Sequence, residues 1–118
     1  MQSRKDVIKF CMELENIYED YPFHDKNWTI MRHKDNSRMF AAIYERNKYI
    51  WVNVKCDPNL SYMWRNSFNS VIPAYHMNKE HWNSIILDGT VPDDDIKSMI
   101  FDSYKLTLSK KRIRIIFN

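Results

Sequence analysis

Between residues 28 and 56 the sequence repeats a pattern of short strand-like segments separated by tight polar turns. The segments are Trp28–His33, Met39–Glu45 and Tyr49–Cys56, and the turns are Asp35-Asn36-Ser37 and Arg46-Asn47-Lys48. In the third segment Ile50, Val52, Val54 and Cys56 alternate with Trp51, Asn53 and Lys55. Period-two alternation with short polar turns is typical of antiparallel strands that bury one face. The pattern therefore predicts an antiparallel meander.

Segments on both sides of the meander predict helices. From Ser3 to about Glu19 the apolar residues return at spacings of four and three, which indicates an amphipathic helix with Ser3 as its N-cap. Asp57-Pro58 combines an N-cap residue with proline at the first helical position. Pro92 and Asp93 open a last helix, and aspartates fill its first turn as the helix dipole favours.

Two further strand candidates, Val71–Tyr75 and Trp82–Leu87, lie between the second helix and the last one. The order of elements is thus α-β-β-β-α-β-β-α. Because the strands cluster in hairpins and do not alternate with helices, we predict an α+β fold. We expect an antiparallel sheet of about five strands with helices packed on one face.

The length of 118 residues suits one domain, so residues 1–118 are expected to form a single unit. Residues 110–118 are a basic and apolar C-terminal extension. Lys110, Lys111 and Arg112 are expected near the end of the last helix. The apolar residues that follow, IRIIFN, could add an edge strand, cover an exposed patch or fray, and the sequence leaves these alternatives open.

Composition excludes some functions. The single glycine, Gly89, excludes glycine-rich phosphate-binding loops. A formal charge of +3 permits contact with nucleic acid but does not require it. Cys11 and Cys56 lie far apart in sequence, no signal peptide is visible, and no apolar run approaches the ~20 residues of a membrane helix. We therefore expect a monomer with free thiols in a reducing cytoplasm, without a membrane partner.

Several separate segments resemble one family. They are YPFHDKNWTI, RMFAAIY, VKCDPNLSYMWR and the long stretch VIPAYHMNKEHWNSIILDGTVPDDDIKSMIFDSYKLTL. In this order they are similar to the MmcQ/YjbR family of small bacterial proteins, over residues 6 to about 110. The chain departs from the family at His24, where the family usually has glycine, and in its extended C-terminus.

The resemblance implies an architecture similar to the CyaY/frataxin-like sandwich, with a "double wing" arrangement proposed to bind DNA. Double-stranded DNA is therefore our first partner hypothesis, because basic hairpin tips can reach phosphates. The candidate phosphate contacts are Lys34, Arg38, Arg46, Lys48 and Lys79. The structural alternative is that hairpin tips are simply where solvated lysines lie.

The segment PAYHMNKEHW supports a second hypothesis, from a different class. It concentrates polar and aromatic side chains immediately before a strand, and a small anionic ligand or a protein partner could bind there. The candidate residues are Tyr75, His76, Asn78, Lys79, Trp82 and Tyr104. In the structural alternative Asn78 caps the turn, the histidines bond backbone carbonyls and Trp82 packs inward.

No catalytic residue, metal site or cofactor is predicted. His76 and His81 are five residues apart, but the other half of a zinc signature is missing. Cys11 and Cys56 fall in apolar stripes, whereas a nucleophilic thiol needs an exposed, electropositive setting. Asp57 is better explained as a helix cap than as a catalytic acid. We therefore expect a non-enzymatic binding protein.

Overall fold

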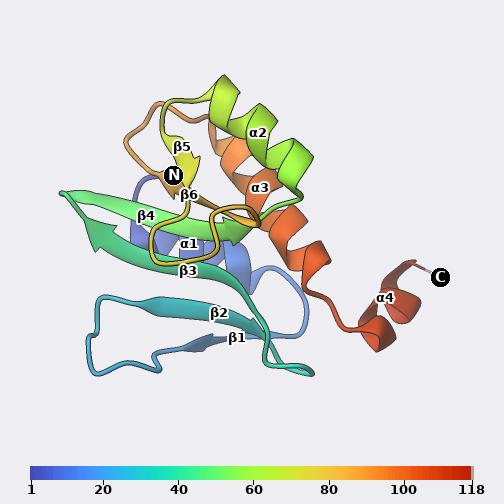
Figure 1. Ribbon diagram of the computed structural model, residues 1–118. Coiled ribbons are helices and arrows are strands. Elements are labelled where there is room, and N and C mark those ends of the chain that lie inside the picture. The colour runs from blue at the N-terminus through green and yellow to red at the C-terminus, as the bar shows by residue number, and fades with distance from the viewer. Residues whose placement is uncertain (118) are drawn as a thin grey trace.

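The computed structural model describes residues 1–117 and contains one antiparallel sheet of six strands with four helices. The strands are β1 (Ile17–Asp20), β2 (Thr29–His33), β3 (Met39–Arg46), β4 (Tyr49–Lys55), β5 (Val71–Pro73) and β6 (Trp82–Ile86). The helices are α1 (Arg4–Met12), α2 (Pro58–Ser67), α3 (Asp93–Leu106) and α4 (Lys110–Phe117). The sheet order is β1-β2-β3-β4-β6-β5 (Figure 1). The predicted α+β class and the antiparallel meander are confirmed.

The core lies between one face of the sheet and helices α1 and α3. Val52 of β4 pairs with Ile85 of β6, and both are fully buried in the cluster that includes Val7 of α1 and Ile100 of α3. Because side chains alternate along a strand, the neighbouring residues of β3, β4 and β6 point to the opposite face. We call that opposite face the open face, since neither α1 nor α3 covers it.

The first helix is shorter than predicted, and the sheet has one strand more. Ser3 caps α1 as expected, because its Oγ accepts a hydrogen bond from the backbone N–H of Asp6 at 3.1 Å. The helix ends at Met12, however, and residues 17–20 form the edge strand β1. Asn16 separates the two elements with a left-handed φ of 62°, a conformation that asparagine tolerates better than most residues. Backbone pairing with β2 therefore prevails over the helical spacing of the apolar side chains.

The second helix begins as the sequence predicts. Asp57 is its N-cap, with a side-chain oxygen that accepts from the backbone N–H of Asn59 at 3.0 Å, and Pro58 occupies the first turn. This helix packs along the edge strand β5. None of the helices in residues 1–117 combines the length and the apolar character needed to cross a bilayer.

The C-terminal extension forms a helix of its own, and this corrects the sequence prediction. Lys110, Lys111 and Arg112 were expected at the end of the last helix, but α3 ends at Leu106 and Thr107 is its C-cap. The three residues begin α4, which projects from the body at the right of Figure 1. Asn118 lies outside the described residues.

Candidate binding groove on the open face of the sheet

Three buried polar side chains form a hydrogen-bonded network at the centre of the open face. The hydroxyl of Tyr44 donates to Asn53 Oδ1 at 2.8 Å, and the hydroxyl of Ser84 donates to the same oxygen at 2.5 Å. Burial raises the pKa of Tyr44, which keeps this phenol protonated as a donor. Each group has a partner within the protein, so the network is a fixed platform.

The network also holds the segment that follows β5. Asn53 Nδ2 donates to the carbonyl of Tyr75 at 2.9 Å, and the backbone N–H of Tyr75 donates to Ser84 Oγ at 2.9 Å. Both backbone groups of Tyr75 are thus bonded to side chains of the sheet. This pins residues 74–77 over the open face, although they belong to a connection between strands.

Aromatic rings cover the network. Trp28 stacks on Tyr44 with ring centroids 4.1 Å apart and planes 22° from parallel. Tyr75 lies 5.8 Å from the ring of Tyr44, and the guanidinium of Arg46 sits 4.0 Å from the Tyr75 centroid and 4.7 Å from that of Trp51. A cation–π arrangement of this kind fixes the position of the arginine, and its positive charge interacts with the faces of the two rings. Arg46 is therefore an ordered part of the open face as well as a residue near a hairpin tip.

A groove of about 500 Å³ runs beside this aromatic cluster. Its lining comes from β2, from β3, from the connection between β1 and β2 and from the connection between β5 and β6. It consists of Phe23, Asp25, Trp28, Ile30, Met39, Ala42, His76 and Met77. Most of these side chains are apolar, and Asp25 and His76 supply the titratable groups. A half-open apolar groove with two polar groups at its rim has the composition of a small-molecule site. We call it the open-face groove.

The residues predicted for a ligand site are only partly brought together. His76 lines the open-face groove, and Tyr75 lies next to it with ring centroids 3.9 Å apart. Tyr104 lies on the other side of the sheet, where its hydroxyl donates to the carbonyl of Glu15 and its ring contacts His33. The sequence grouped Tyr104 with this segment, and the structure separates them.

The remaining candidates of that segment, Asn78, Lys79 and Trp82, do not line the groove. Asn78 Oδ1 accepts from the backbone N–H groups of Glu80 and His81 at 2.9 and 3.3 Å, so it caps the turn as the structural alternative predicted. The carbonyl of Lys79 accepts from Arg65, and its side chain is exposed. Trp82 is half-buried opposite Lys55 and is not among the residues that line the groove.

Sequence reasoning missed the part of the groove that lies on the strands. Ile30 pairs with Ala42, and Ala42 is two residues before Tyr44, so all three point to the open face. Alternation along β3 could have predicted the shared face of Ala42 and Tyr44. The contribution of Phe23 and Met77 could not have been predicted, because it depends on how two connections lie on the sheet.

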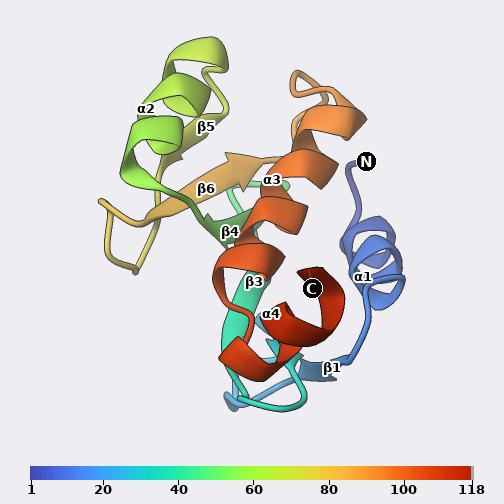
Figure 2. The same ribbon diagram turned by 90° about the vertical axis from the view of Figure 1, so that its right-hand side faces the viewer.

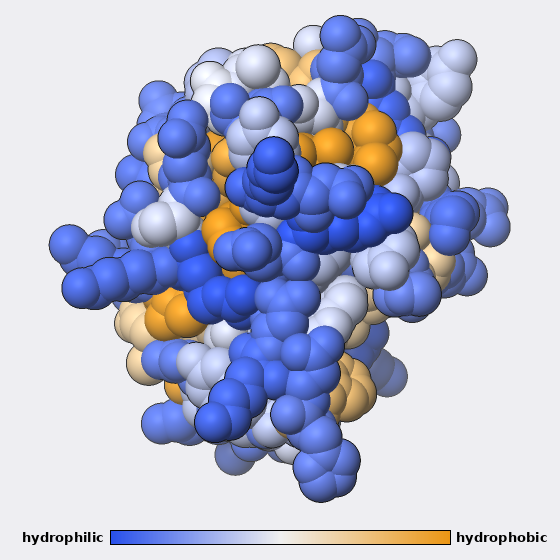
Figure 3. Space-filling model, turned by 90° about the vertical axis from the view of Figure 1, so that its left-hand side faces the viewer, coloured by the Kyte–Doolittle hydropathy of each residue, from blue (hydrophilic) through white to orange (hydrophobic). Residues whose placement is uncertain are grey.

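The cations predicted to contact DNA lie at two ends of the sheet. Lys34 and Arg38 are exposed at the tip between β2 and β3, whereas Arg46 and Lys48 lie at the tip between β3 and β4 (Figure 1). Successive hairpins of a meander turn at opposite ends, and the eight residues of β3 separate the two tips by roughly 25 Å. The surface that carries the β3–β4 tip is mostly hydrophilic, with apolar patches interrupted by polar side chains (Figure 3).

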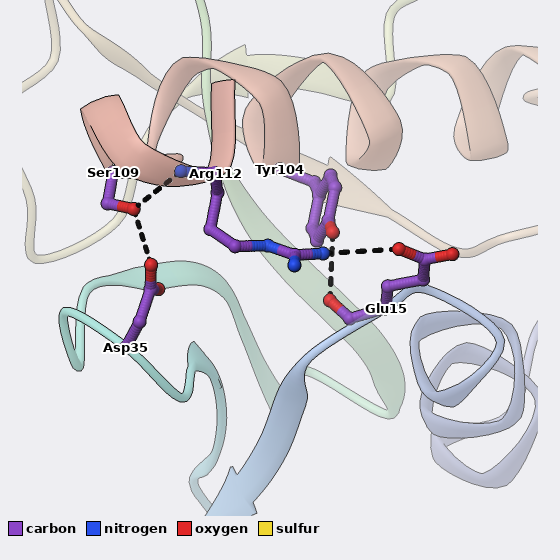
Figure 4. Close-up of polar contacts among 5 residues, drawn as sticks. All are labelled: Glu15, Asp35, Tyr104, Ser109 and Arg112. Atoms are coloured by element: carbon purple, nitrogen blue, oxygen red, sulfur yellow. Dashed lines mark hydrogen bonds and ion pairs between the residues drawn. The ribbon is translucent and has the colours of Figure 1, made fainter. Parts of the chain in front are cut away.

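Helix α4 lies beside the β2–β3 tip and adds cations there. The Ser109 hydroxyl donates to the Asp35 carboxylate, and Asn36 Nδ2 donates to the carbonyl of Thr107 at 3.0 Å. Arg112 Nη2 pairs with the Glu15 carboxylate at 3.1 Å, and its backbone N–H donates to Ser109 Oγ (Figure 4). These contacts place one end of α4 against the hairpin tip and the turn after α1. The exposed cations gathered at this end are Lys34, Arg38, Lys110, Lys111 and Arg114, and we call them the basic end.

Both cysteines are buried free thiols, as predicted. Cys11 is fully buried, and desolvation raises the pKa of its thiol to about 12. Cys56 is 5% exposed, and desolvation is also the main cause that raises its pKa. Neither thiol has the lowered pKa of a nucleophile. Within residues 1–117 no three side chains of histidine, cysteine, aspartate or glutamate converge as metal ligands.

Comparison with known proteins identifies relatives along most of the chain. A family model described as YjbR matches residues 12–106, which excludes α4. The uncharacterized protein YyaQ of Bacillus subtilis is 33% identical over 118 residues, covering 91% of this chain and 99% of YyaQ. The uncharacterized protein YjbR of Escherichia coli K12 is 27% identical over 100 residues, covering 85% and 82%.

Solved structures agree with the fold. The Deinococcus radiodurans protein DR2400, with a domain described as DUF419, superposes with a TM-score of 0.86 at 30% identity, covering 97% of this chain and 87% of that one. A crystal structure of a Pseudomonas syringae protein gives a TM-score of 0.80 at 28% identity, covering 90% and 99%.

Proposed function

The chain belongs to the YjbR family, and we propose that it is a non-enzymatic binding protein whose ligand occupies the open-face groove. The observation that carries this proposal is the groove itself: about 500 Å³, mostly apolar, and built on a rigid polar platform. Its volume falls within the ~300–1,000 Å³ typical of small-molecule sites. A platform fixed before binding lowers the entropy cost of complex formation.

The lining favours a flat, apolar ligand body. Trp28 offers an aromatic surface for stacking, and Met39 and Met77 offer polarizable side chains that adapt to irregular shapes. The rim carries the carboxylate of Asp25 and the imidazole of His76. This mixed pair favours a ligand with both donor and acceptor groups over a strongly anionic one.

The chemistry of the site supports binding more than catalysis. Tyr44, Asn53 and Ser84 are bonded to one another beneath the aromatic rings, so none of these three side chains is available as an acid, base or nucleophile. The titratable groups that line the groove, Asp25 and His76, come from two separate connections.

We further propose a bacterial, cytoplasmic setting and a CyaY-like relationship for the sandwich. The buried free thiols support a reducing compartment. The relatives from Bacillus subtilis and Escherichia coli support a bacterial source.

Filling the groove tests the proposal. Ala42 is 2% exposed and lines the groove floor, so Ala42→Phe places a ring in the space that a ligand would occupy. We expect the uncharged fluorescent probe N-phenyl-1-naphthylamine, an aromatic molecule with one N–H donor, to bind the folded wild type saturably. Ala42→Phe should weaken that binding by at least about tenfold, which corresponds to ~1.4 kcal/mol.

The matched control fills a different hollow. Leu60→Phe adds bulk between α2 and α3 and should leave the affinity for the probe unchanged. Circular dichroism should show that both variants are folded. Unchanged binding by Ala42→Phe, or lost binding by Leu60→Phe, would refute the groove as the site.

Double-stranded DNA is a second candidate ligand, and the basic end is the observation that favours it. Its five exposed cations form no ion pair with another residue among 1–117. We propose that any contact with duplex uses the β2–β3 tip together with α4. The β3–β4 tip would lie roughly 25 Å away along β3.

The salt dependence of binding tests this second candidate. If five phosphates are neutralised, affinity for a labelled duplex should fall about 500-fold between 50 and 200 mM salt, from a slope of about −4.5. Replacing Lys110, Lys111 and Arg114 together by alanine should reduce the slope by about 3. The control variant Lys48→Ala should keep the wild-type slope. A flat salt profile would remove DNA as a ligand.

A further inference from the structure

Helix α4 has an apolar side that its own chain leaves uncovered. None of its residues is buried, and its large apolar side chains are 38–60% exposed: Ile113, Ile115, Ile116 and Phe117. The contacts that hold it are polar and lie at its N-terminal half, at Ser109 and Arg112. A helix of eight residues has little stability of its own in water. Clustered exposed apolar side chains of this kind mark an interaction surface.

A complementary surface lies between α2 and α3. A groove of about 310 Å³ opens there, lined by Cys56, Asp57, Leu60, Asp102, Lys105 and Leu106. Leu60 and Leu106 are 42% and 45% exposed, and Met63 on α2 is 46% exposed. Figure 2 shows α2, α3 and α4 together on the side of the molecule that faces the viewer, with α4 in front. We call this hollow the helix groove.

The chain's own α4 does not fill the helix groove. Thr107, between α3 and α4, is buried, and its hydroxyl bonds to the ring of His33 and to the carbonyl of Ser103. Leu108 is 5% exposed and belongs to the core. These anchors direct α4 toward the β2–β3 tip and the turn after α1, away from α2 (Figure 2).

We propose that two copies of this chain associate symmetrically, with α4 of each copy seated in the helix groove of the other. Ile113, Ile116 and Phe117 recur at spacings of three and four, so they share one side of α4. Lys110, Lys111 and Arg114 follow the same spacing on another side. The apolar side matches the leucines of the helix groove, and the cations match its rim.

Charge favours this occupant. The rim of the helix groove carries the carboxylates of Asp57 and Asp102, with Lys105 paired to Asp102 at 3.3 Å. The rim therefore carries a net negative charge, whereas the side of α4 that holds Lys110, Lys111 and Arg114 is positive. Unlike charges across an interface steer association and fix its register.

Two-fold symmetry enlarges the interface that a single contact between α4 and the helix groove would form. In a two-fold dimer every contact occurs twice, and the pairing closes without forming filaments. One eight-residue helix in one groove is a small contact, and the two-fold pairing doubles the area that it buries. The helix groove is recessed between two helices, so it fits an inserted helix better than a flat lipid surface.

Sedimentation velocity across the micromolar range tests the proposal. The wild type should shift from the monomer mass to twice that mass as concentration rises. Ile116→Asp and, independently, Leu60→Asp should each remain monomeric, since a charge replaces an exposed apolar contact without entering the core. Tyr49→Asp is the matched control, because Tyr49 is 48% exposed on the distant β3–β4 hairpin, and it should dimerise like the wild type.

A cross-link test checks the reciprocal geometry. Chains with Leu60→Cys mixed with chains carrying Ile116→Cys should be joined by a short bis-maleimide, and neither variant alone should be joined efficiently. A wild type that stays monomeric throughout overturns the proposal, as does a dimer that survives both aspartate variants. A monomer that sediments with phosphatidylglycerol vesicles but not with phosphatidylcholine vesicles would also overturn it, and would assign α4 to a membrane surface.

Discussion

Tyr44 connects the interior of the sheet to the proposed ligand site. Its hydroxyl donates to Asn53 Oδ1 and lies 3.3 Å from Ser84 Oγ, its ring stacks against Trp28, and the ring of Tyr75 also packs against it. The same residue therefore contributes to stability and shapes the open-face groove. Its hydrogen bonds are buried, so a partner left unsatisfied there is costly.

Removing the Tyr44 hydroxyl should destabilise the protein measurably. Tyr44→Phe deletes one buried hydrogen bond, while Asn53 Oδ1 keeps its bond from Ser84, so we expect a loss of about 1 kcal/mol in the free energy of unfolding. Tyr49→Phe is the control, because Tyr49 is 48% exposed, and it should change stability by less than about 0.5 kcal/mol. Urea denaturation measures both. Equal effects of the two variants would contradict the role given to the network.

His33 should make stability depend on pH. Its ring is 1% exposed and bonds to Thr107 Oγ1 at 2.8 Å. Burial lowers the pKa of this imidazole, and the cations Arg38 and Arg112 add to that effect while Asp35 opposes it. In the unfolded chain a histidine takes up a proton near pH 6.5, whereas the folded protein resists it. Stability is therefore full above about pH 6.5 and falls as pH drops toward the lower pKa of the folded state.

Unfolding free energies at pH 7.5 and 5.5 check this prediction. The wild type should lose up to about 1.4 kcal/mol per pH unit below 6.5 from this residue. His33→Gln should show a smaller loss, because glutamine does not titrate. His81→Gln, at an exposed position, is the control and should keep the wild-type slope. Parallel slopes in all three proteins would contradict the assignment to His33.

At the scale of elements, the hairpin between β3 and β4 turns through two residues with left-handed backbone. Asn47 has a φ of 52° and Lys48 a φ of 72°. Paired positive φ values belong to the type I′ turn, which fits the twist of a hairpin and favours Asn-Gly. Lysine is thus a costly choice at the second position.

Lys48→Gly should therefore stabilise the protein. Glycine adopts positive φ without a steric penalty, and we expect a gain of about 0.5–1 kcal/mol, measured by thermal unfolding. Lys48→Ala removes the same charge but keeps the Cβ, so it should bring no such gain. If both variants behaved alike, the effect would come from charge and not from the backbone.

Much of the element pattern could be predicted from the sequence, and its failures have identifiable causes. The meander and the caps at Ser3 and Asp57 depend on local patterns, and the structure confirms them. The strand at residues 17–20 was missed, because its apolar spacing also fits a helix and pairing with β2 is not a local property. The start of α4 was missed for lack of a strong stop signal after Leu106.

The candidate site could be predicted only in part. The segment around His76 was correctly singled out, but its partners on β2 and β3 were not. Tyr104 was wrongly grouped with it, since sequence patterns do not indicate which side of the sheet a distant helix covers. The two basic hairpin tips lie at opposite ends of β3, because successive hairpins of a meander turn at opposite ends of the sheet. The sequence was sufficient to predict this separation.

At the scale of the whole molecule, the sheet separates two surfaces with different uses. The open face carries the groove proposed for a small ligand, and the helix side carries α4 and the groove between α2 and α3. The two proposals depend on different residues, so each can fail without the other. The net charge of +3 is concentrated in part at the basic end, which leaves the open-face groove with a mixed rim.

The most direct measurement is a fragment screen read out by two-dimensional NMR of the nitrogen-labelled protein. The chain has four tryptophans, so each indole N–H gives its own signal, and Trp28 is the tryptophan that lines the open-face groove. Flat apolar fragments should shift the Trp28 indole and the amides of Ala42 and Met77 saturably, and should leave Trp64 on α2 unchanged. Fragments that shift Trp64 or α4 while Trp28 stays fixed would contradict the assignment of the open face as the ligand site.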